Sequence, residues 1–380
     1  MWKNTFAAVL ATALCTCAFA QPSPLDTEAN HPLQLLPGTN GKTPTGYTPQ
    51  QMQHAYGVDQ IANQGAGQIV ATIVAFDYPS LESDLAVFTT QFGLPACTQA
   101  NGCLSIVYAA GTRPPPNRGW SAETSLDVQW AHAIAPQARI LVVEAANGKV
   151  QTLLEAVPIA VQLGATAINM SWGTNKEPPN EQNYDQHFFA DANVTYINAS
   201  GDLGHNLFGY PGASPLVVGA GGTTLKLDSA GNILGEVAWS GSGGGESMYF
   251  PEPSYQLSAQ SSGKRGVPDV AYNANPYTGV PVYNSEIGGW VEAGGTSASS
   301  PQWCAITAIA NGVRAGIGKG PIGTNFLNVI YANPTAFHDI TQGSNSKCGA
   351  LCNAGPGYDF VTGIGSPIAP QVVNALATAP

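Results

Sequence analysis

The feature that most constrains the fold is a regular alternation between continuous apolar stretches and helical patterns along the chain. Continuous apolar strands are buried on both faces, and strands separated by helices pair in parallel. The sequence therefore predicts an α/β fold of three layers, in which a mostly parallel central sheet carries helices on both faces. Ligands bind such sheets at the carboxyl ends of the strands. The predicted strands are residues 68–76, 139–144, 167–172, 194–199 and 216–219, and the predicted helices are residues 81–92, 121–134, 152–163 and 301–310.

The composition limits the partners of this chain. Of its 380 residues 44% are hydrophobic and only 10% are charged, against about 25% charged in ordinary globular proteins. Lys and Arg number 13 and form no cluster, which argues against binding to nucleic acid or to a membrane. The 24 Asp and Glu residues outnumber these cations. A surface with so few cations gathers little positive charge when its carboxylates protonate, so this composition suits a protein that works in an acidic medium. The alternative is a secreted protein of neutral surroundings with a polar, uncharged surface.

The first twenty residues have the pattern of a secretory signal peptide. Lys3 gives a positive start, residues 5–18 are apolar, and Ala-Phe-Ala at 18–20 is a small-x-small cleavage site. We therefore expect a secreted protein, extracellular or periplasmic. A lipoprotein at Cys15 or Cys17 is the disfavoured alternative. The expected organisation is a signal peptide at 1–20, a flexible leader or short pro-segment at 21–45, and one domain at 46–380.

The remaining cysteines form two close pairs and one single residue. Cys97 with Cys103, and Cys348 with Cys352, would close small loops as disulfides in an exported protein. Zinc binding is the alternative, although no histidine stands at ligand spacing from either pair. Cys304 lies in an apolar helical pattern, which predicts a buried free thiol.

Ser297 is the strongest candidate nucleophile. It lies in the segment Gly-Gly-Thr-Ser-Ala-Ser-Ser-Pro at 294–301, where glycines allow close backbone approach and Pro301 is expected to open a helix. A serine at a helix N-terminus can expose its hydroxyl, and the helix dipole favours negative charge nearby. An ordinary helix N-cap is the alternative.

Three carboxyl groups accompany this serine. Glu123 and Asp127 are four residues apart on a predicted helix, which places them on one face. Apolar neighbours indicate partial burial, where two close carboxyls share a proton, although a solvated face is the alternative. Asp202 follows a predicted strand in Ser-Gly-Asp-Leu-Gly. If buried and protonated it could donate a hydrogen bond to an oxyanion, and otherwise it is a turn residue.

Together these three segments resemble the signatures of the serine-carboxyl peptidases, the sedolisin family, in order and context over residues 47–368. The resemblance implies a subtilisin-like fold in which a glutamate replaces the histidine base. It implies that Ser297 is the nucleophile, Glu123 its general base, and Asp127 the residue that orients Glu123. Asp202 and the backbone N–H of Ser297 would stabilise the oxyanion. Typical members carry a long N-terminal pro-domain, whereas the leader expected here covers only residues 21–45. The resemblance is therefore to a bacterial-type member with a short or absent pro-domain.

The resemblance also implies two binding regions. Ser171, Trp172 and Gly173 form a strand edge similar to the one that pairs with an extended substrate. Near the C-terminus, two segments resemble the family's calcium loop, with one structural Ca²⁺ held by oxygen ligands. A glycine-rich turn with surface aspartates is the alternative for this loop. The implied ligands are the carboxylates of Asp339 and Asp359 and the carbonyls of Ile340, Gly355 and Gly357.

The expected function is therefore that of a secreted, acid-active, monomeric endopeptidase acting on polypeptides through an acyl-enzyme. Alternatives are a non-catalytic binding protein on the same fold, a tripeptidyl-peptidase, and a hydrolase of non-peptide esters or amides. A neutral Ser-His-Asp hydrolase using Asp77 and His132 is another alternative. It is disfavoured because His132 lies nine residues after Glu123, on the opposite side of the helix.

Overall fold

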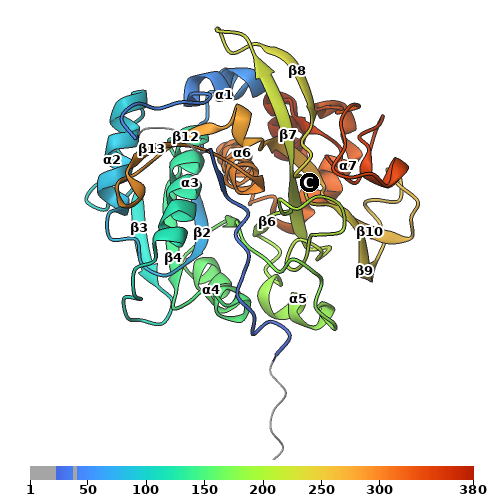
Figure 1. Cartoon of the computed structure of the whole chain (residues 1–380), viewed down its shortest axis with the longest axis horizontal. Coiled ribbons are helices and arrows are strands. Elements are labelled where there is room, and N and C mark those ends of the chain that lie inside the picture. Colours follow the sequence, from blue (N-terminus) through green and yellow to red (C-terminus); the bar gives the residue numbers. More distant parts are fainter. Residues whose placement is uncertain (1–22, 37–40) are drawn as a thin grey trace, which may run out of the picture.

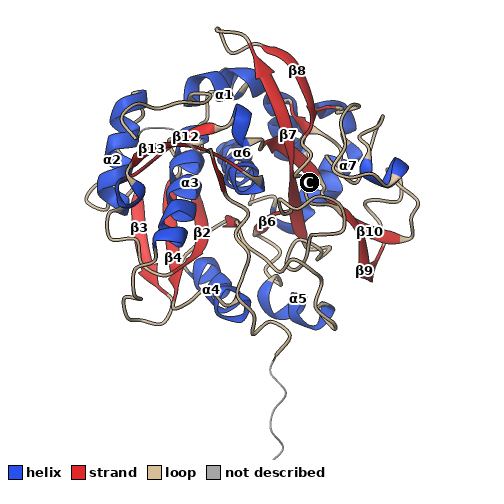
Figure 2. Cartoon of the chain, in the orientation of Figure 1, coloured by secondary structure: helices blue, strands red, loops and turns tan. Residues whose placement is uncertain are grey.

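The computed structural model describes residues 23–36 and 41–380, so the predicted signal peptide lies outside the described residues. An eight-stranded sheet forms the centre, in the order β11-β7-β6-β5-β2-β4-β3, with β8 beside β7 (Figures 1 and 2). All its neighbouring strands are parallel except β7 and β8. The strands of this sheet are β2 (Ile69–Ala75), β3 (Leu104–Tyr108), β4 (Arg139–Ala145), β5 (Ala167–Met170), β6 (Thr195–Ala199), β7 (Val217–Leu227), β8 (Ile233–Ala238) and β11 (Val270–Asn273).

Helices cover both faces of this sheet. The central strands β2, β4 and β5 are consequently buried along almost every residue. Helices α3 and α6 pack side by side against β2, whereas α4 packs on β2 and β4 and contacts α5. The predicted α/β fold with a mostly parallel sheet is confirmed. The helices are α1 (Pro49–Tyr56), α2 (Leu81–Phe92), α3 (Arg118–Ile134), α4 (Val150–Gln162), α5 (Gln182–Phe188), α6 (Thr296–Gly316), α7 (Phe326–Ala332) and α8 (Ala369–Thr378).

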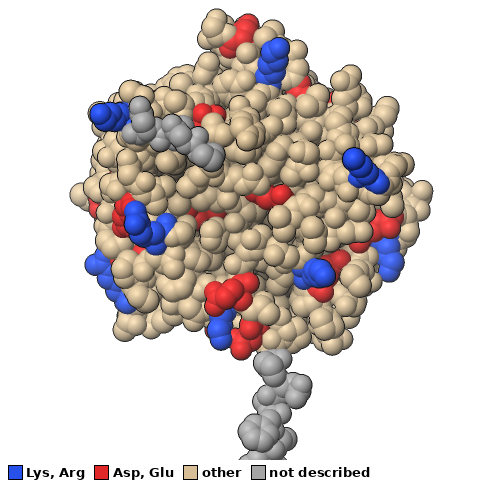
Figure 3. Space-filling model, in the orientation of Figure 1, with Lys and Arg blue, Asp and Glu red and all other residues tan. Residues whose placement is uncertain are grey.

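Smaller sheets complete the described part of the chain. The leader contributes β1, which pairs antiparallel with β13 beside β12. Figure 3 shows few charged side chains on the viewed face, with no cluster of Lys and Arg among them. None of the helices in the described residues has the length and apolar character needed to cross a membrane. The remaining strands are β1 (Gln34–Leu35), β9 (Gly245–Pro251), β10 (Lys264–Val267), β12 (Val280–Asn284), β13 (Gly289–Gly294), β14 (Phe337–His338) and β15 (Ser366–Pro367).

The expectation that Pro301 opens a helix is wrong, because α6 begins at Thr296 and contains Pro301 in its second turn. The N-cap residue is Gly295, whose φ of 95° is a conformation that glycine adopts readily. Pro301 has no N–H to donate to the carbonyl of Ser297 four residues before it. The helix tolerates this loss close to its N-terminus. The earlier start brings Ser297 into the first turn of α6.

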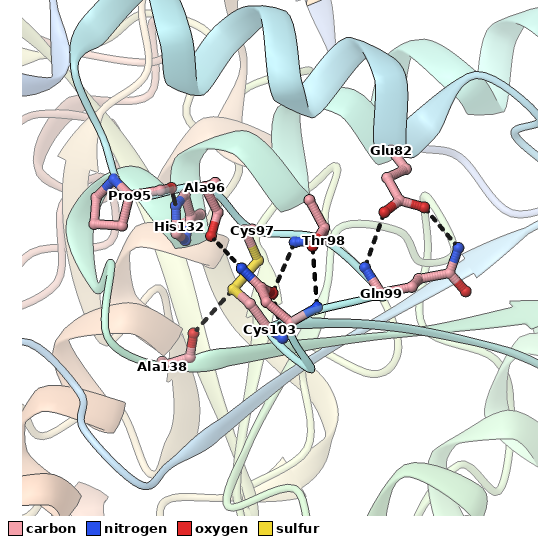
Figure 4. The surroundings of a disulfide bond; sticks show 10 residues. Glu82, Pro95, Ala96, Cys97, Thr98, Gln99, Cys103, His132 and Ala138 are labelled. Carbon is pink, nitrogen blue, oxygen red and sulfur yellow. Dashed lines mark hydrogen bonds between the residues drawn. A yellow bond between two sulfur atoms is a disulfide. The ribbon is translucent and has the colours of Figure 1, made fainter.

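The cysteines lie as the sequence predicted. The structure contains the disulfides Cys97–Cys103 and Cys348–Cys352, and Cys304 is free and buried. Figure 4 shows His132 beside the first disulfide, where its Nε2 lies 2.8 Å from the Pro95 carbonyl oxygen. This ring therefore faces the disulfide side of α3, away from Glu123, as the helical phase predicts.

Candidate active site

Helix α3 places Glu123 and Asp127 in the interior, and both side chains are fully buried. Asp127 accepts hydrogen bonds from Thr72 Oγ1 at 2.7 Å and from Ser171 Oγ at 2.8 Å. The carboxylate oxygens of Glu123 have no hydrogen-bond partner within the described residues. Burial and the neighbouring Glu123 charge raise the pKa of Asp127, against the lowering effect of its hydroxyl donors. The pair is therefore a buried carboxyl pair and not a solvated helix face.

Ser297 lies in the first turn of α6, beside α3. Its hydroxyl is buried and has no hydrogen-bond partner among the described residues. Its backbone N–H donates to the Pro32 carbonyl oxygen at 3.2 Å. A buried serine hydroxyl with free hydrogen-bonding capacity, on a helix packed against the helix of a buried carboxylate, provides the components of a nucleophile and its base. Hydrogen bonds between such groups often form only when substrate binds.

Asp202 follows β6 and reaches the N-terminus of α6. Its Oδ1 accepts hydrogen bonds from the Thr296 backbone N–H at 2.8 Å and from the Thr296 hydroxyl at 3.0 Å. Its Oδ2 is buried without a partner in the described structure. Burial raises the pKa of Asp202 to about 8, against the lowering effect of the Thr296 hydrogen bonds. Below that pH the carboxyl group holds a proton, which makes it a donor for an oxyanion.

Gly295 lies next to both the Asp202 carboxylate and the Pro32 carbonyl of the leader. A Cβ at this position would lie 2.6 Å from Asp202 Oδ2 and 2.1 Å from the Pro32 carbonyl oxygen. The two oxygens therefore meet over the Gly295 backbone, and any side chain there would displace them. The Ser297 N–H donates to the same Pro32 oxygen, so this carbonyl lies at the N-terminus of α6, on the side where Asp202 approaches.

The leader segment, residues 23–36, crosses the carboxyl edge of the sheet and pairs with other backbone segments at Glu28, Asn30 and Gln34–Leu35. Asn30 pairs antiparallel with Gly173, and each residue donates its N–H to the carbonyl of the other at 2.9 Å. His31 Nδ1 lies 3.6 Å from Glu123 Oε2, and its ring packs 5.0 Å from that of Trp120. Burial would lower the pKa of His31, but Glu123 raises it above its ordinary value. No pattern in the sequence predicts that His31 lies at this site.

The leader continues on both sides of this contact. Before it, the carbonyls of Leu25 and Thr27 accept hydrogen bonds from the start of α4. After it, Gln34 and Leu35 pair with β13 as strand β1. The edge therefore holds a chain that continues on both sides of its contact with the Ser297 N–H.

The three residues expected to bind substrate lie differently from one another. Gly173 pairs with the leader backbone, as a substrate-binding strand edge would. Ser171 is buried, and its hydroxyl points to Asp127. Trp172 is also buried, with its indole N–H donating to the Ile73 carbonyl at 2.7 Å. Trp172 therefore packs beneath the edge. The Ser171 side chain binds Asp127 of the carboxyl pair.

Asp77 lies at the end of β2, where it binds Arg113 Nη2 at 2.8 Å. Its backbone N–H donates to the Pro115 carbonyl. These contacts give Asp77 a structural role, and His132 faces another side of its helix. The described structure therefore brings no Asp77-His132-Ser297 triad together.

Four of the five expected calcium ligands, Asp339, Gly355, Gly357 and Asp359, lie together at one glycine-rich turn. Both carboxylate oxygens of Asp339 accept from the Gly357 N–H, at 3.0 and 3.1 Å. Asp359 is buried and accepts from the Gly355 N–H at 3.3 Å and from the Val361 N–H at 2.8 Å. The two carboxylates thus approach the turn from different segments, and the donor set contains oxygen alone. This chemistry fits a hard divalent cation.

The chain belongs to the subtilase family, whose family model matches residues 101–316. Within it the chain is a member of the sedolisin, or serine-carboxyl peptidase, family. It is 34% identical over 368 residues to kumamolisin of Bacillus sp. (strain MN-32), across 88% of this chain and 64% of that protein. It is 33% identical to tripeptidyl-peptidase SED1 of Arthroderma otae, across 42% of this chain and 28% of that protein. The chain therefore spans less than two thirds of these relatives.

Structural similarity agrees with this assignment. The solved structure of a Pseudomonas sedolisin, a serine-carboxyl proteinase complexed with two molecules of pseudo-iodotyrostatin, matches with a TM-score of 0.75. The identity is 25%, and the match covers 87% of this chain and 98% of that chain. The predicted family and its subtilisin-like fold are confirmed.

Proposed function

We propose that this protein is a secreted, acid-active serine-carboxyl endopeptidase that hydrolyses peptide bonds through an acyl-enzyme on Ser297. The observation that carries the proposal is the position of the leader carbonyl at Pro32. It accepts the Ser297 N–H and lies beside the unpartnered oxygen of Asp202. In this proposal the leader presents a backbone carbonyl at the N-terminus of the helix that carries Ser297, beside Asp202, as a substrate would.

In the proposed reaction, Glu123 takes the hydroxyl proton of Ser297 as Oγ attacks the carbonyl carbon of the peptide bond. Protonated Asp202 and the Ser297 N–H donate to the developing oxyanion. The C–N bond breaks as Glu123 gives its proton to the leaving amine. Water then attacks the acyl-enzyme by the same steps and regenerates the Ser297 hydroxyl. Asp127 positions Glu123, and the two buried carboxyl groups share one proton.

The path of the leader favours an endopeptidase over a tripeptidyl-peptidase. A tripeptidyl-peptidase needs a barrier three residues before the cleaved bond. Here residues 25–29 continue past that point and bind the start of α4 through backbone hydrogen bonds. We infer that the substrate edge is open at both ends.

The leader that occupies this edge would compete with any substrate. Its backbone contacts reproduce those of an extended peptide, and Lys149 Nζ binds Asp26 at 2.7 Å at its far end. We therefore infer that residues 21–45 act as a short pro-segment. Two disulfides and the predicted signal peptide support an exported, oxidising location.

The test is cleavage of a reduced, unfolded protein at pH 4, with the product ends identified by mass spectrometry. Internal cuts that disappear in Ser297→Ala are expected. Products consisting of tripeptides alone would favour the tripeptidyl-peptidase reading. An absence of cleavage by folded protein that has lost its leader would favour the binding-protein reading.

We also propose one structural Ca²⁺ held by Asp339 and Asp359, with carbonyl oxygens of Ile340, Gly355 and Gly357. The ion would neutralise two carboxylates and tie together segments about twenty residues apart. Its support is the convergence of oxygen donors on the glycine-rich turn.

Removal of calcium is expected to lower the melting temperature by several degrees. At a calcium concentration 100-fold above its Kd, binding contributes about 2.7 kcal/mol to stability. Thermal unfolding with added calcium or with a chelator measures the effect. Asp339→Ala should melt at the lower temperature under both conditions, whereas Asp59→Ala, at an exposed site, should keep the calcium response. Equal melting of the wild-type protein in both conditions would contradict the calcium site.

A further inference from the structure

A hydrogen-bond network connects the helix of Ser297 to Asp127 through the middle of the sheet. Ser300, three residues after Ser297 on α6, donates its hydroxyl to Asn169 Oδ1 at 2.6 Å. Asn169 is on β5, and its Nδ2 lies 3.1 Å from both Thr72 Oγ1 and Ser171 Oγ. These two hydroxyls donate to the two carboxylate oxygens of Asp127.

The amide of Asn169 fixes the direction of both hydroxyl groups. An amide nitrogen can only donate hydrogen bonds, so Thr72 and Ser171 must each accept from it through an oxygen lone pair. Their own hydrogens are then directed to Asp127. Asn169 Oδ1 lies 3.3 Å from Ser171 Oγ, but its shorter contact is with Ser300. Because Thr72 and Ser171 use their hydrogens on Asp127, they must face the amide nitrogen, which leaves Oδ1 to accept from Ser300 on α6.

The network is buried and precisely registered. Asn169, Ser171 and Ser300 are fully buried, and Thr72 is 3% exposed. Thr72 is the parallel partner of Asn169 in the pairing of β2 with β5. Buried polar networks are stable when every member is satisfied, and each link here has a donor and an acceptor. Side-chain hydroxyls at these positions could satisfy backbone groups instead, yet those of Thr72 and Ser171 point to Asp127 and that of Ser300 points to Asn169.

We propose that Asn169 is the positioning residue for Asp127, and that it keeps two hydroxyl donors aimed at that carboxylate in register with the Ser297 helix. This inference rests on the proposed function, because Asp127 acts there through Glu123. It assigns to Thr72, Asn169 and Ser300 a role in the pH dependence of the reaction and not only in packing. The quantity concerned is the acid limb of kcat/KM, the low-pH range in which activity rises with pH.

The titratable groups that face Asp127 are few. Glu123 faces it from the same helix, and the Cys304 thiol faces it from α6. From β2 and from β5 with its following residue, the contacts are the Thr72 hydroxyl, the Asn169 amide and the Ser171 hydroxyl, none of which titrates. The two hydroxyl donors thus oppose the burial and the Glu123 charge, which both disfavour ionised Asp127. Loss of a donor must move the titration of the carboxyl pair upward.

Thr72→Val is the sharpest test, because it removes one hydroxyl and keeps the shape of the side chain. The acid limb of kcat/KM is expected to move upward by about one pH unit, as one hydrogen bond to a charged group has that size. Thr72→Ser should restore the wild-type limb. Asn169→Ala should shift it further, since both hydroxyls lose their fixed direction.

Thr195→Val is the matched control. Thr195 is buried on β6, and its hydroxyl donates to the Gly323 carbonyl at 2.9 Å, outside the network. It is expected to alter thermal stability without moving the acid limb. Urea unfolding of every variant separates loss of folding from loss of positioning.

These variants test the proposed function and the role of the hydrogen-bond network separately. Activity that survives Ser297→Ala would overturn the proposed function itself. Activity that depends on Ser297, with an unchanged acid limb in folded Thr72→Val and Asn169→Ala, would overturn the network's role and leave the proposed function standing. A shift in Thr72→Val that Thr72→Ser reverses would support the inference.

Discussion

Asp202→Ala is expected to lower kcat by about 100- to 1,000-fold, which is the usual effect of removing one oxyanion donor. Under the proposed function, Asp202 has two separate tasks. Its Oδ1 is fixed by the Thr296 backbone and hydroxyl, so Oδ2 alone remains for the oxyanion. KM should change little, because the lost interaction forms mainly in the transition state.

Asp202→Asn is the informative companion variant. An asparagine can keep Oδ1 as the acceptor from Thr296 and place an amide donor where Oδ2 lies. Wild-type activity should fall as the pH approaches about 8, since Asp202 then loses the proton that it donates. The amide does not titrate, so Asp202→Asn should keep its activity over that range. Steady-state kinetics from pH 3 to 9 measures both effects, and the same alkaline limb in the variant would exclude Asp202 as its source.

The second large effect concerns folding stability, which is expected to fall as the pH rises from 4 to 7. Burial raises the pKa of Glu181 to about 10, Glu144 to about 8 and Asp185 to about 7. In the folded protein these groups hold their protons at pH 4–7, whereas in the unfolded chain they ionise near their ordinary values. Unfolding therefore releases protons, and each carboxyl costs about 1.4 kcal/mol of stability per pH unit until its folded pKa is reached.

Urea unfolding at pH 4, 5.5 and 7 measures this dependence. Glu181→Gln should reduce the loss, because both oxygens of Glu181 are buried without partners in the described structure and close to Glu177. Glu155→Gln, at an exposed position on α4, should leave the slope unchanged. Stability that rises toward pH 7 would contradict the assignment of these buried carboxyls as neutral.

Local patterns were sufficient to predict the central elements. The helix at 81–92 has the predicted bounds, and β2, β4 and β6 lie within one residue of prediction at either end. The four-residue spacing of Glu123 and Asp127 correctly placed both on one buried face, since helical periodicity is a local property. The predicted start of α6 at Pro301 is wrong. The helix begins at Thr296, directly after Gly295, whose positive φ is a conformation that glycine adopts readily.

The surroundings of these residues could not be predicted in the same way. The position of His31 against Glu123 depends on a leader that crosses the sheet edge, and nothing near His31 in the sequence signals this. The Asn169 network depends on the register of β2 with β5, whose residues are far apart in the chain. Such contacts arise from tertiary pairing, so a single sequence identifies their members only as polar residues in apolar strands.

The central claim is that a carboxylate, Glu123, serves as the base for Ser297. The most direct measurement is cleavage of an unfolded protein from pH 3 to 8 by the wild-type protein, Ser297→Ala and Glu123→Gln. Glutamine keeps the size of Glu123 and cannot accept the serine proton as a carboxylate does. We expect cleavage at acidic pH that declines as the pH approaches about 8, and that is lost by at least about 1,000-fold in both folded variants. Cleavage that persists in Glu123→Gln, or that peaks near pH 8 in the wild-type protein, would contradict it.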